Sequence, residues 1–303
     1  MPILRKMSRF TAFALAVVCL VSSAVSAHPG SGIVVDADGQ VYFLDTGSGL
    51  WRIDGQGKLT HLPGPRYHWL TLDANNAFAK TEIPTGADAD IAKSGSSPTL
   101  LLSSDYPIAK GQDGSLYYPS ARRGAPRGLQ IMRLKPSGET SVLAALPDTA
   151  KGPLPHLNGI AAGPENSIYY TENDVIRRIA ATGEISKVAT IPALVDGPKI
   201  PGTDQHPLLR GLAIDPSGVL YVADDGDARV LKITPQGKVT TLLQLQSHWA
   251  PTAVALSGSD LYVLEYVHTA QDDRLAWLPR VRKIAADGKS TIVATVDQMP
   301  GAR

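Results

Sequence analysis

The stretch RGLAIDPSGVLYVAD, residues 210–224, recurs along the chain and decides the fold. It is typical of a strand, a tight turn and a second strand. The other copies are SGIVVDADGQVYFLD (31–45), NGIAAGPENSIYYTE (158–172) and PTAVALSGSDLYVLE (251–265), with weaker copies in HWLTLDANNAFAKTE (68–82) and IAKGQDGSLYYPS (108–120). Internal repetition of this kind indicates a repeat architecture.

A second unit follows every copy and supplies two more strands. It begins with Ile or Leu, continues for three residues to a glycine, and ends in a β-rich run such as ITPQGKVTTLLQL from Ile233. Glycine suits a tight hairpin because it accepts a positive φ without steric cost. The six glycines are Gly57, Gly95, Gly138, Gly183, Gly237 and Gly288.

Four short strands repeated six times, at intervals of about 40 to 50 residues, are typical of a β-propeller. We therefore predict an all-β fold, a six-bladed β-propeller of four-stranded antiparallel blades. A parallel solenoid is the alternative, but hairpin turns between successive strands argue against it. The first and last blades should close the ring by packing side by side, without exchanging a strand. The predicted blades cover approximately residues 31–63, 67–103, 105–147, 157–192, 209–246 and 251–297.

Residues 1–27 have the pattern of a secretory signal peptide, with a basic start, an apolar stretch at 10–21 and small residues up to Ala27. The apolar stretch is shorter than the ~20 residues that span a bilayer. We expect a secreted or periplasmic protein, a single propeller domain at 28–303, and no membrane span after signal removal. Removal takes three basic residues from a chain of formal charge +1, leaving −2, which does not favour nucleic-acid binding. It also removes Cys19, the one cysteine, so the mature chain should contain no disulfide.

Long insertions gather on one face of the predicted propeller. This long-loop face carries the connections between second and third strands and between blades, whereas turns on the other face are short, such as DPSG at 215–218. Binding and catalytic residues concentrate on loops that a rigid scaffold holds. The insertions are residues 121–128, 147–156, 192–208, 246–251 and 266–279.

We therefore place the candidate site where the inner strands begin, at the axial mouth of the long-loop face. Imidazoles there could perform acid–base chemistry, and a guanidinium could hold an anion or a developing oxyanion. The candidate catalytic residues are His156, Arg210, His248 and His268. The candidate ligand-binding residues are Asn158, Tyr67, Tyr106, Arg122, Arg127 and His206. The arginines could bind a carboxylate or phosphate together with Arg210; the alternative is a solvated basic loop.

The units GLAIDPSGVLYVAD and NGIAAGPENSIYYTE resemble NHL repeats and the gluconolactonase (regucalcin)-like propellers, over essentially the whole mature chain. The resemblance implies a divalent metal ion, Ca, Mg or Zn, held by residues that open inner strands. Asn158 matches the metal-binding asparagine of that family. The equivalent positions in the other blades hold Ser31, Tyr67, Tyr106, Arg210 and Pro251, so one of the four family ligands is matched.

A second resemblance is to the peptidyl-hydroxyglycine amidating lyases, which are also NHL-like propellers and hold zinc with histidines from alternate blades. Here His68, His156 and His248 enter blades two, four and six. Three imidazoles with an open fourth position would suit a catalytic zinc ion.

Two classes of function follow. The first is a small-molecule hydrolase or lyase, acting on a lactone or ester, with a metal ion among these residues as one version. The second is a non-catalytic propeller that binds a peptide, a glycan or a protein through the same loops. The concentration of histidines on the long-loop face favours the enzyme.

Overall fold

The repeat at residues 209–244 shows how the sequence forms one blade. β16 (Leu209–Ile214) pairs with β17 (Leu220–Asp224), β17 with β18 (Arg229–Ile233), and β18 with β19 (Val239–Gln244), all antiparallel. In β18 every residue is buried except the half-buried Lys232, as expected for a strand inside a blade with both faces covered. The turn between β16 and β17 contains Gly218 at φ +85°. This hairpin-after-hairpin order is repeated around the molecule.

The computed structural model describes residues 29–83, 90–122, 128–147, 157–198, 207–246, 248–268 and 277–297. Four further sheets keep the order of their strands along the chain. Blade one contains β1 (Ile33–Val35), β2 (Val41–Asp45), β3 (Gly49–Ile53) and β4 (Leu59–Leu62). Blade three contains β8 (Ala109–Lys110), β9 (Leu116–Ala121), β10 (Leu129–Leu134) and β11 (Thr140–Ala145). Blade four contains β12 (Leu157–Ala162), η1 (Pro164–Asn166), β13 (Ile168–Glu172), β14 (Val175–Ile179) and β15 (Ile185–Thr190). Blade six contains β20 (Trp249–Ser257), β21 (Asp260–Val267), β22 (Pro279–Ile284) and β23 (Ser290–Thr295).

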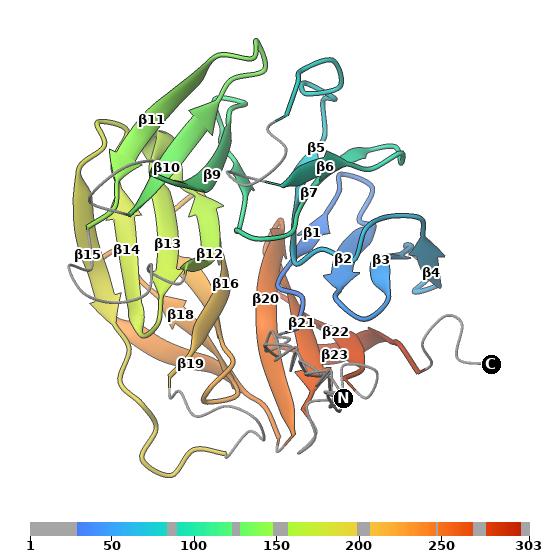
Figure 1. Cartoon of the computed structure of the whole chain (residues 1–303). Helices are drawn as coiled ribbons and strands as arrows, with labels where there is room; N and C mark the ends of the chain where they lie inside the picture. Colours follow the sequence, from blue (N-terminus) through green and yellow to red (C-terminus); the bar gives the residue numbers. More distant parts are fainter. Residues whose placement is uncertain are drawn as a thin grey trace, which may run out of the picture.

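The six sheets surround a common axis, which confirms the six-bladed propeller (Figure 1). The innermost strands, β1, β5, β8, β12, β16 and β20, contact one another in a closed ring. A buried apolar cluster fills each of the six joints between neighbouring blades. Because each sheet buries both of its faces against a neighbour, the joints hold the ring together.

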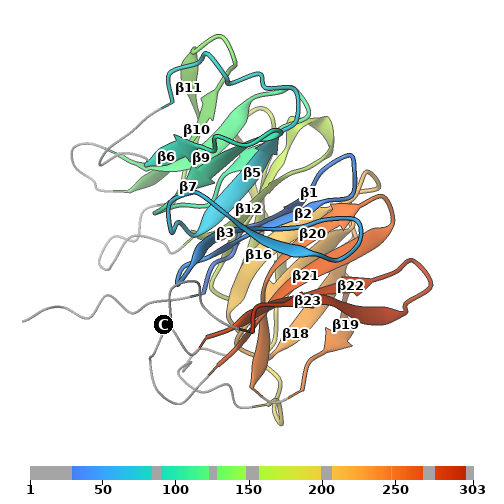
Figure 2. The same ribbon diagram turned by 90° about the vertical axis from the view of Figure 1, so that its right-hand side faces the viewer.

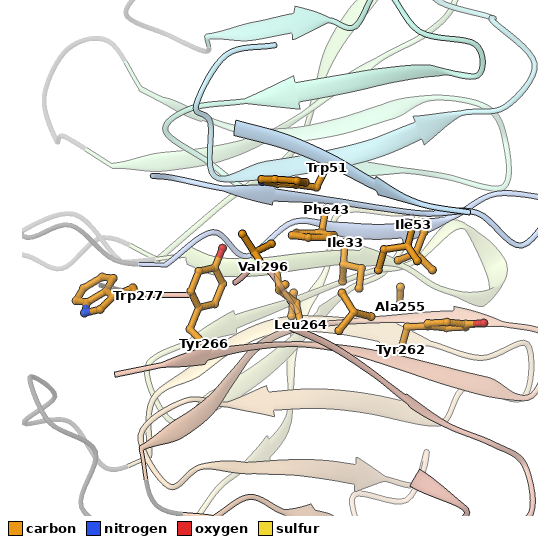
Figure 3. Close-up of a cluster of buried hydrophobic side chains, with 13 residues drawn as sticks. Ile33, Phe43, Trp51, Ile53, Ala255, Tyr262, Leu264, Tyr266, Trp277 and Val296 are labelled. Carbon is orange, nitrogen blue, oxygen red and sulfur yellow. The ribbon is translucent and has the colours of Figure 1, made fainter. Parts of the chain in front are cut away.

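The ring closes between blades one and six by side-chain packing, as predicted, because each of these sheets contains only its own four strands. Figure 3 shows Ile33, Phe43 and Trp51 of blade one facing Leu264 and Tyr266 of blade six. Burial of one such large side chain stabilises the fold by about 1.5–3 kcal/mol. The Tyr266 hydroxyl also donates to the carbonyl of Leu44 at 3.1 Å.

Blade two differs from the predicted four-stranded pattern. Its described strands are β5 (Trp69–Asp73), β6 (Ile91–Lys93) and β7 (Thr99–Ser103), in the sheet order β5-β7-β6. The expected second strand, within 76–82, forms consecutive turns instead, because the Asp73 carboxylate accepts the Phe78 N–H at 2.8 Å and Phe78 is buried in the joint with blade three. Ala, Asn and Lys in this stretch have low β-propensity, and β7 therefore pairs directly with β5.

The hairpin glycines follow the prediction at five of six positions. Gly57, Gly138, Gly183, Gly237 and Gly288 have φ between +79° and +88°, whereas Gly95, in the irregular blade two, is not among the residues with positive φ. Successive strands are antiparallel, so the turns after first and third strands project to one face. Figure 2 shows the β20–β21 and β22–β23 turns extending to the same side.

Within the described ranges, the chain contains no helix of the length and apolar character that a membrane span requires.

Candidate functional site

The start of β16 and the end of β17 meet on the long-loop face. Leu209 pairs with Asp224, and the strand register is irregular just after Leu209, where the Arg210 side chain reaches Asp225. The Arg210 Nε donates to Asp225 Oδ2 at 2.5 Å. Asp225 is fully buried, and the Arg210 side chain retains 11% exposure. Arg210 thus pairs with a neighbouring carboxylate of its own blade.

His268 approaches the same carboxylate from blade six. It follows β21, and its backbone N–H donates to the His248 carbonyl at 2.7 Å, which closes the base of the β20–β21 hairpin. The imidazole stacks on Trp277 with ring centroids 5.6 Å apart. Its Nε2 lies 3.3 Å from Asp225 Oδ1, a charge-pair distance, but the two atoms are not aligned as a hydrogen bond.

Two opposing effects set the charge of Asp225. Burial would raise the pKa of this carboxyl, but the positive charge of Arg210 and the adjacent His268 imidazole outweigh it and hold the pKa well below its ordinary value. Asp225 is therefore ionised at neutral pH. It is a fixed buried anion that joins a guanidinium from blade five to an imidazole from blade six.

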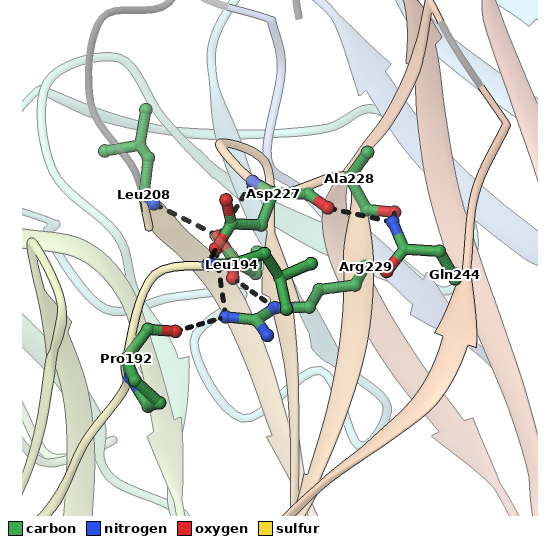
Figure 4. A network of polar contacts seen from close by, with 8 residues as sticks. Pro192, Leu194, Leu208, Asp227, Ala228, Arg229 and Gln244 are labelled. Carbon is green, nitrogen blue, oxygen red and sulfur yellow. Dashed lines mark hydrogen bonds and ion pairs between the residues drawn. The ribbon is translucent and has the colours of Figure 1, made fainter. Parts of the chain in front are cut away.

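A second buried network holds the turn that carries Asp225 (Figure 4). Arg229 Nε donates to Asp224 at 2.8 Å, and its Nη2 donates to Asp227 at 3.0 Å and to the Pro192 carbonyl at 2.7 Å. Asp224 accepts the backbone N–H of Leu208, and Asp227 that of Leu194. Arg229 thus satisfies the flanking carboxylates and ties two crossing segments to the turn, so that Asp225 is left to Arg210 and His268.

A narrow cavity of about 60 Å³ lies on the axis, lined by the inner strands of five blades and, in blade three, by Pro107 and Ile108 just before β8. Ser31 lines it, and its buried Oγ has no hydrogen-bond partner among the described residues. The channel is narrow because the inner strands approach closely; a Cβ on Gly159 would lie 2.5 Å from the Arg210 carbonyl oxygen. A wider cavity of about 330 Å³ opens on the opposite face.

The remaining predicted residues are more dispersed. Asn158 opens β12, next to β16, and is half-buried. His248 is exposed, with φ +74°. His68 Nδ1 lies 2.6 Å from the Ser104 carbonyl oxygen. Tyr67 donates to Asp90 at 2.7 Å, and this hydrogen bond together with burial raises the pKa of Tyr67 to about 12.

Two more candidates belong to blade three. Tyr106 packs against the cluster between blades three and four, and burial together with the Asp105 charge raises its pKa. Arg122 is half-buried and its backbone N–H donates to the Gly128 carbonyl. His156, His206 and Arg127 lie outside the described residues.

The described residues do not fit the metal site that the family resemblance implies. Arg210 lies at an inner-strand position where the resemblance implies a metal ligand. Its guanidinium would repel a divalent ion. It is already paired with the Asp225 carboxylate. No group of three or more His, Cys, Asp or Glu side chains in the described part could hold a metal ion. The zinc hypothesis for His68, His156 and His248 stays a prediction, because His156 lies outside that part.

Asp225 is the functional candidate that sequence reasoning missed. The repeats place one acidic residue at the end of the second strand, and Asp224 fills that position. The signal was the doubled acid in VADDGD, residues 222–227, where the other copies carry one. The fold thus unites Arg210 and His268, both predicted, through an unpredicted carboxylate.

These features define a six-bladed propeller with a buried acid–imidazole pair between blades five and six. The family described as SMP-30/Gluconolactonase/LRE-like region matches residues 111–271, just over half of the chain, and the protein belongs to this family. The gluconolactonase-like resemblance of the repeats is thereby confirmed.

One sequence relative and two solved structures of the same fold illustrate the similarity. The 6-deoxy-6-sulfogluconolactonase of Pseudomonas putida is 29% identical over 221 residues, which cover 68% of this chain and 63% of that protein, less than two thirds of its length. Virginiamycin B lyase from Staphylococcus aureus has a similar fold, with a TM-score of 0.52 and 17% identity over 89% of this chain and 85% of that one. A luciferin-regenerating enzyme gives a TM-score of 0.53 and 15% identity over 89% and 95%.

Proposed function

We propose that the protein opens a small cyclic ester, a lactone, by hydrolysis at the axial mouth of the long-loop face. The observation that carries the proposal is the buried Asp225 carboxylate, paired with Arg210 at 2.5 Å and 3.3 Å from His268 Nε2. A carboxylate beside one nitrogen of an imidazole favours the tautomer protonated there, and leaves the other nitrogen as a base. Membership of the gluconolactonase-like family supports the same class of reaction.

The roles follow from the positions. With its proton on Nε2 toward Asp225, His268 accepts a proton at Nδ1 from a water molecule as the water oxygen adds to the lactone carbonyl carbon. The carbonyl π electrons move to the oxygen and form an oxyanion. When the oxyanion collapses, the ring C–O bond breaks and the departing oxygen takes the proton from Nδ1. The products balance as one hydroxy acid per lactone and water.

The experiment is a proton-release assay over a panel of sugar and aliphatic lactones. His268→Gln should lower kcat by about 100-fold or more, the usual contribution of a general base. His61→Gln is the matched control, because His61 lies exposed on the outer strand β4 and bonds Ser48 there. Full turnover in His268→Gln contradicts the proposal, and ligand binding without turnover of any lactone favours the non-catalytic propeller.

Export is part of the proposal and rests on the signal-like sequence of residues 1–27. N-terminal sequencing of the protein from the periplasm or medium should begin at His28. An intact Met1 on protein in a membrane fraction contradicts export by cleavage.

A further inference from the structure

One edge of the Arg210 guanidinium is left for a ligand. Its Nε bonds Asp225, but neither terminal nitrogen, Nη1 or Nη2, has a partner among the described residues. The side chain is 11% exposed, whereas its carboxylate partner is fully buried. The guanidinium is therefore anchored through Nε, while its two terminal nitrogens keep their donors unused within the described part of the chain.

The position of this edge is fixed by the inner strands. The Arg210 carbonyl accepts the Thr171 hydroxyl at 2.9 Å and packs against Gly159 of the neighbouring inner strand. Both contacts come from blade four, so blades four and five hold the backbone while Asp225 holds the side chain. Arginine thus occupies, rigidly, the kind of inner-strand position at which the family resemblance implies a metal ligand.

We propose that Arg210 is an anion-binding residue whose free guanidinium edge takes a carboxylate or oxyanion at the axial mouth, in the place where the family resemblance implies a divalent metal ion. A guanidinium presents two parallel N–H donors that match the two oxygens of a carboxylate. Preorganisation by Asp225 removes much of the entropic cost of ordering a long side chain. Lysine carries the same charge but lacks the fork.

For turnover the inference rests on the proposed function. Hydrolysis of a lactone produces an oxyanion in the transition state and a carboxylate in the product, and the same edge would stabilise both. Anion binding itself does not depend on that reaction and can be tested alone.

The binding test uses acetate, with acetamide as the neutral analogue of the same shape. In two-dimensional ¹H–¹⁵N spectra, the side-chain Nε–H signal of Arg210, assigned by its loss in Arg210→Lys, should shift saturably with acetate and not with acetamide. Arg210→Lys keeps a cation for Asp225 and should fold, yet bind acetate about tenfold more weakly, measured by protection against thermal unfolding. The matched control is Arg178→Lys, since Arg178 pairs 3.6 Å from the exposed Glu165 on blade four.

The metal test measures the same titration after dialysis against EDTA, and the melting temperature with added Mg²⁺, Ca²⁺ or Zn²⁺. We expect unchanged acetate binding and no stabilisation by any of the three ions. Stoichiometric metal in the purified protein, acetate binding that requires a metal, or equal binding of acetate and acetamide overturns the inference.

The two proposals fail separately. Acetate binding without turnover of any lactone leaves the anion site standing and removes the proposed function. If Arg210→Lys turns over a lactone with unchanged kcat, KM and acetate inhibition, the proposed function stands and the anion site at Arg210 is removed.

Discussion

Asp45, at the end of the second strand of blade one, and Asp225, one residue beyond the second strand of blade five, are both buried carboxyl groups, yet their surroundings give them opposite chemistry. Asp45 accepts hydrogen bonds from the Ser48 N–H and hydroxyl and from Tyr266, and pairs with no described cation. Burial therefore raises the pKa of Asp45. Asp225 has Arg210 and His268 beside it, and its pKa is lowered. Burial alone favours the neutral acid; an adjacent cation decides whether a buried carboxyl is a fixed charge.

The repeat shows where the cations come from. The equivalent acids of the later blades, Glu172, Asp224 and Glu265, pair with arginines from third strands. Their recurrence therefore has a structural explanation in these ion pairs. Asp45 pairs with no described arginine and instead accepts a hydrogen bond from Tyr266 across the joint between blades one and six. Asp225 is an addition to the repeat, which is why we assign it to function.

The largest effect is expected from a substitution that removes the cation paired with Asp225. Arg210→Met should destabilise the fold by about 3–5 kcal/mol, because it leaves an uncompensated buried carboxylate. Urea unfolding followed by circular dichroism measures this loss. Arg178→Met, which breaks an exposed pair, should cost less than about 1 kcal/mol. A similar small loss for both variants would show that Asp225 does not depend on Arg210.

The next prediction compares the roles of Asp225 and Asp45 in turnover. Asp225→Asn should reduce lactone turnover by about 100-fold, because an amide no longer stabilises the protonated form of His268. Asp45→Asn should leave kcat within about twofold, since Asp45 contacts none of the candidate catalytic groups. Steady-state kinetics with the best lactone of the panel measure both. Equal losses in the two variants would remove the distinction.

The sequence predicted the ring but not all of its parts. Six copies of a strand–turn–strand unit encode the propeller directly, because each copy must bury its faces against the next. The copy at 68–82 has the length of the other copies and forms the first strand. Residues such as Asn76 and Lys80 have low β-propensity, and no second strand forms there. The repeat can be recognised in the sequence. The loss of the second strand in blade two depends on the buried contacts of Phe78, which only the structure shows.

The candidate site was predicted in part for a related reason. Strand ends put Arg210 and His268 on one face, but their convergence depends on how far two blades approach at the axis. Asp225 sits outside the repeat pattern, so nothing periodic marked it. The zinc hypothesis rested only on the alternate blades in which the three histidines lie. A sequence pattern could not show that His68 contacts the Ser104 carbonyl oxygen.

A smaller effect tests Asp225 through pH. Its folded-state pKa lies below the unfolded value, so its contribution to stability is complete above about pH 4 and is lost as pH falls through the acid range. This loss should be on the order of 2 kcal/mol. Unfolding free energies from about pH 5 to pH 2 should therefore fall less steeply in Asp225→Asn than in the wild type. Parallel curves would contradict an ionised Asp225 in the folded protein.

The smallest effect has the opposite sign and concerns Asp45. Its folded-state pKa is raised, so the folded protein holds this proton more tightly than the unfolded chain does. Stability that comes from the protonated form is then complete below the unfolded pKa, near 4, and is lost as pH rises toward the folded-state value. Asparagine does not ionise, so the stability of Asp45→Asn relative to the wild type should increase by on the order of 1 kcal/mol from about pH 3 to pH 7. Thermal unfolding across that range measures the difference, with Asp260→Asn as a control, because the exposed pairing of Asp260 with Lys283 lowers the Asp260 pKa and should give a change of the other sign. If Asp45→Asn instead loses stability relative to the wild type as pH rises, Asp45 is ionised in the fold and the contrast with Asp225 is wrong.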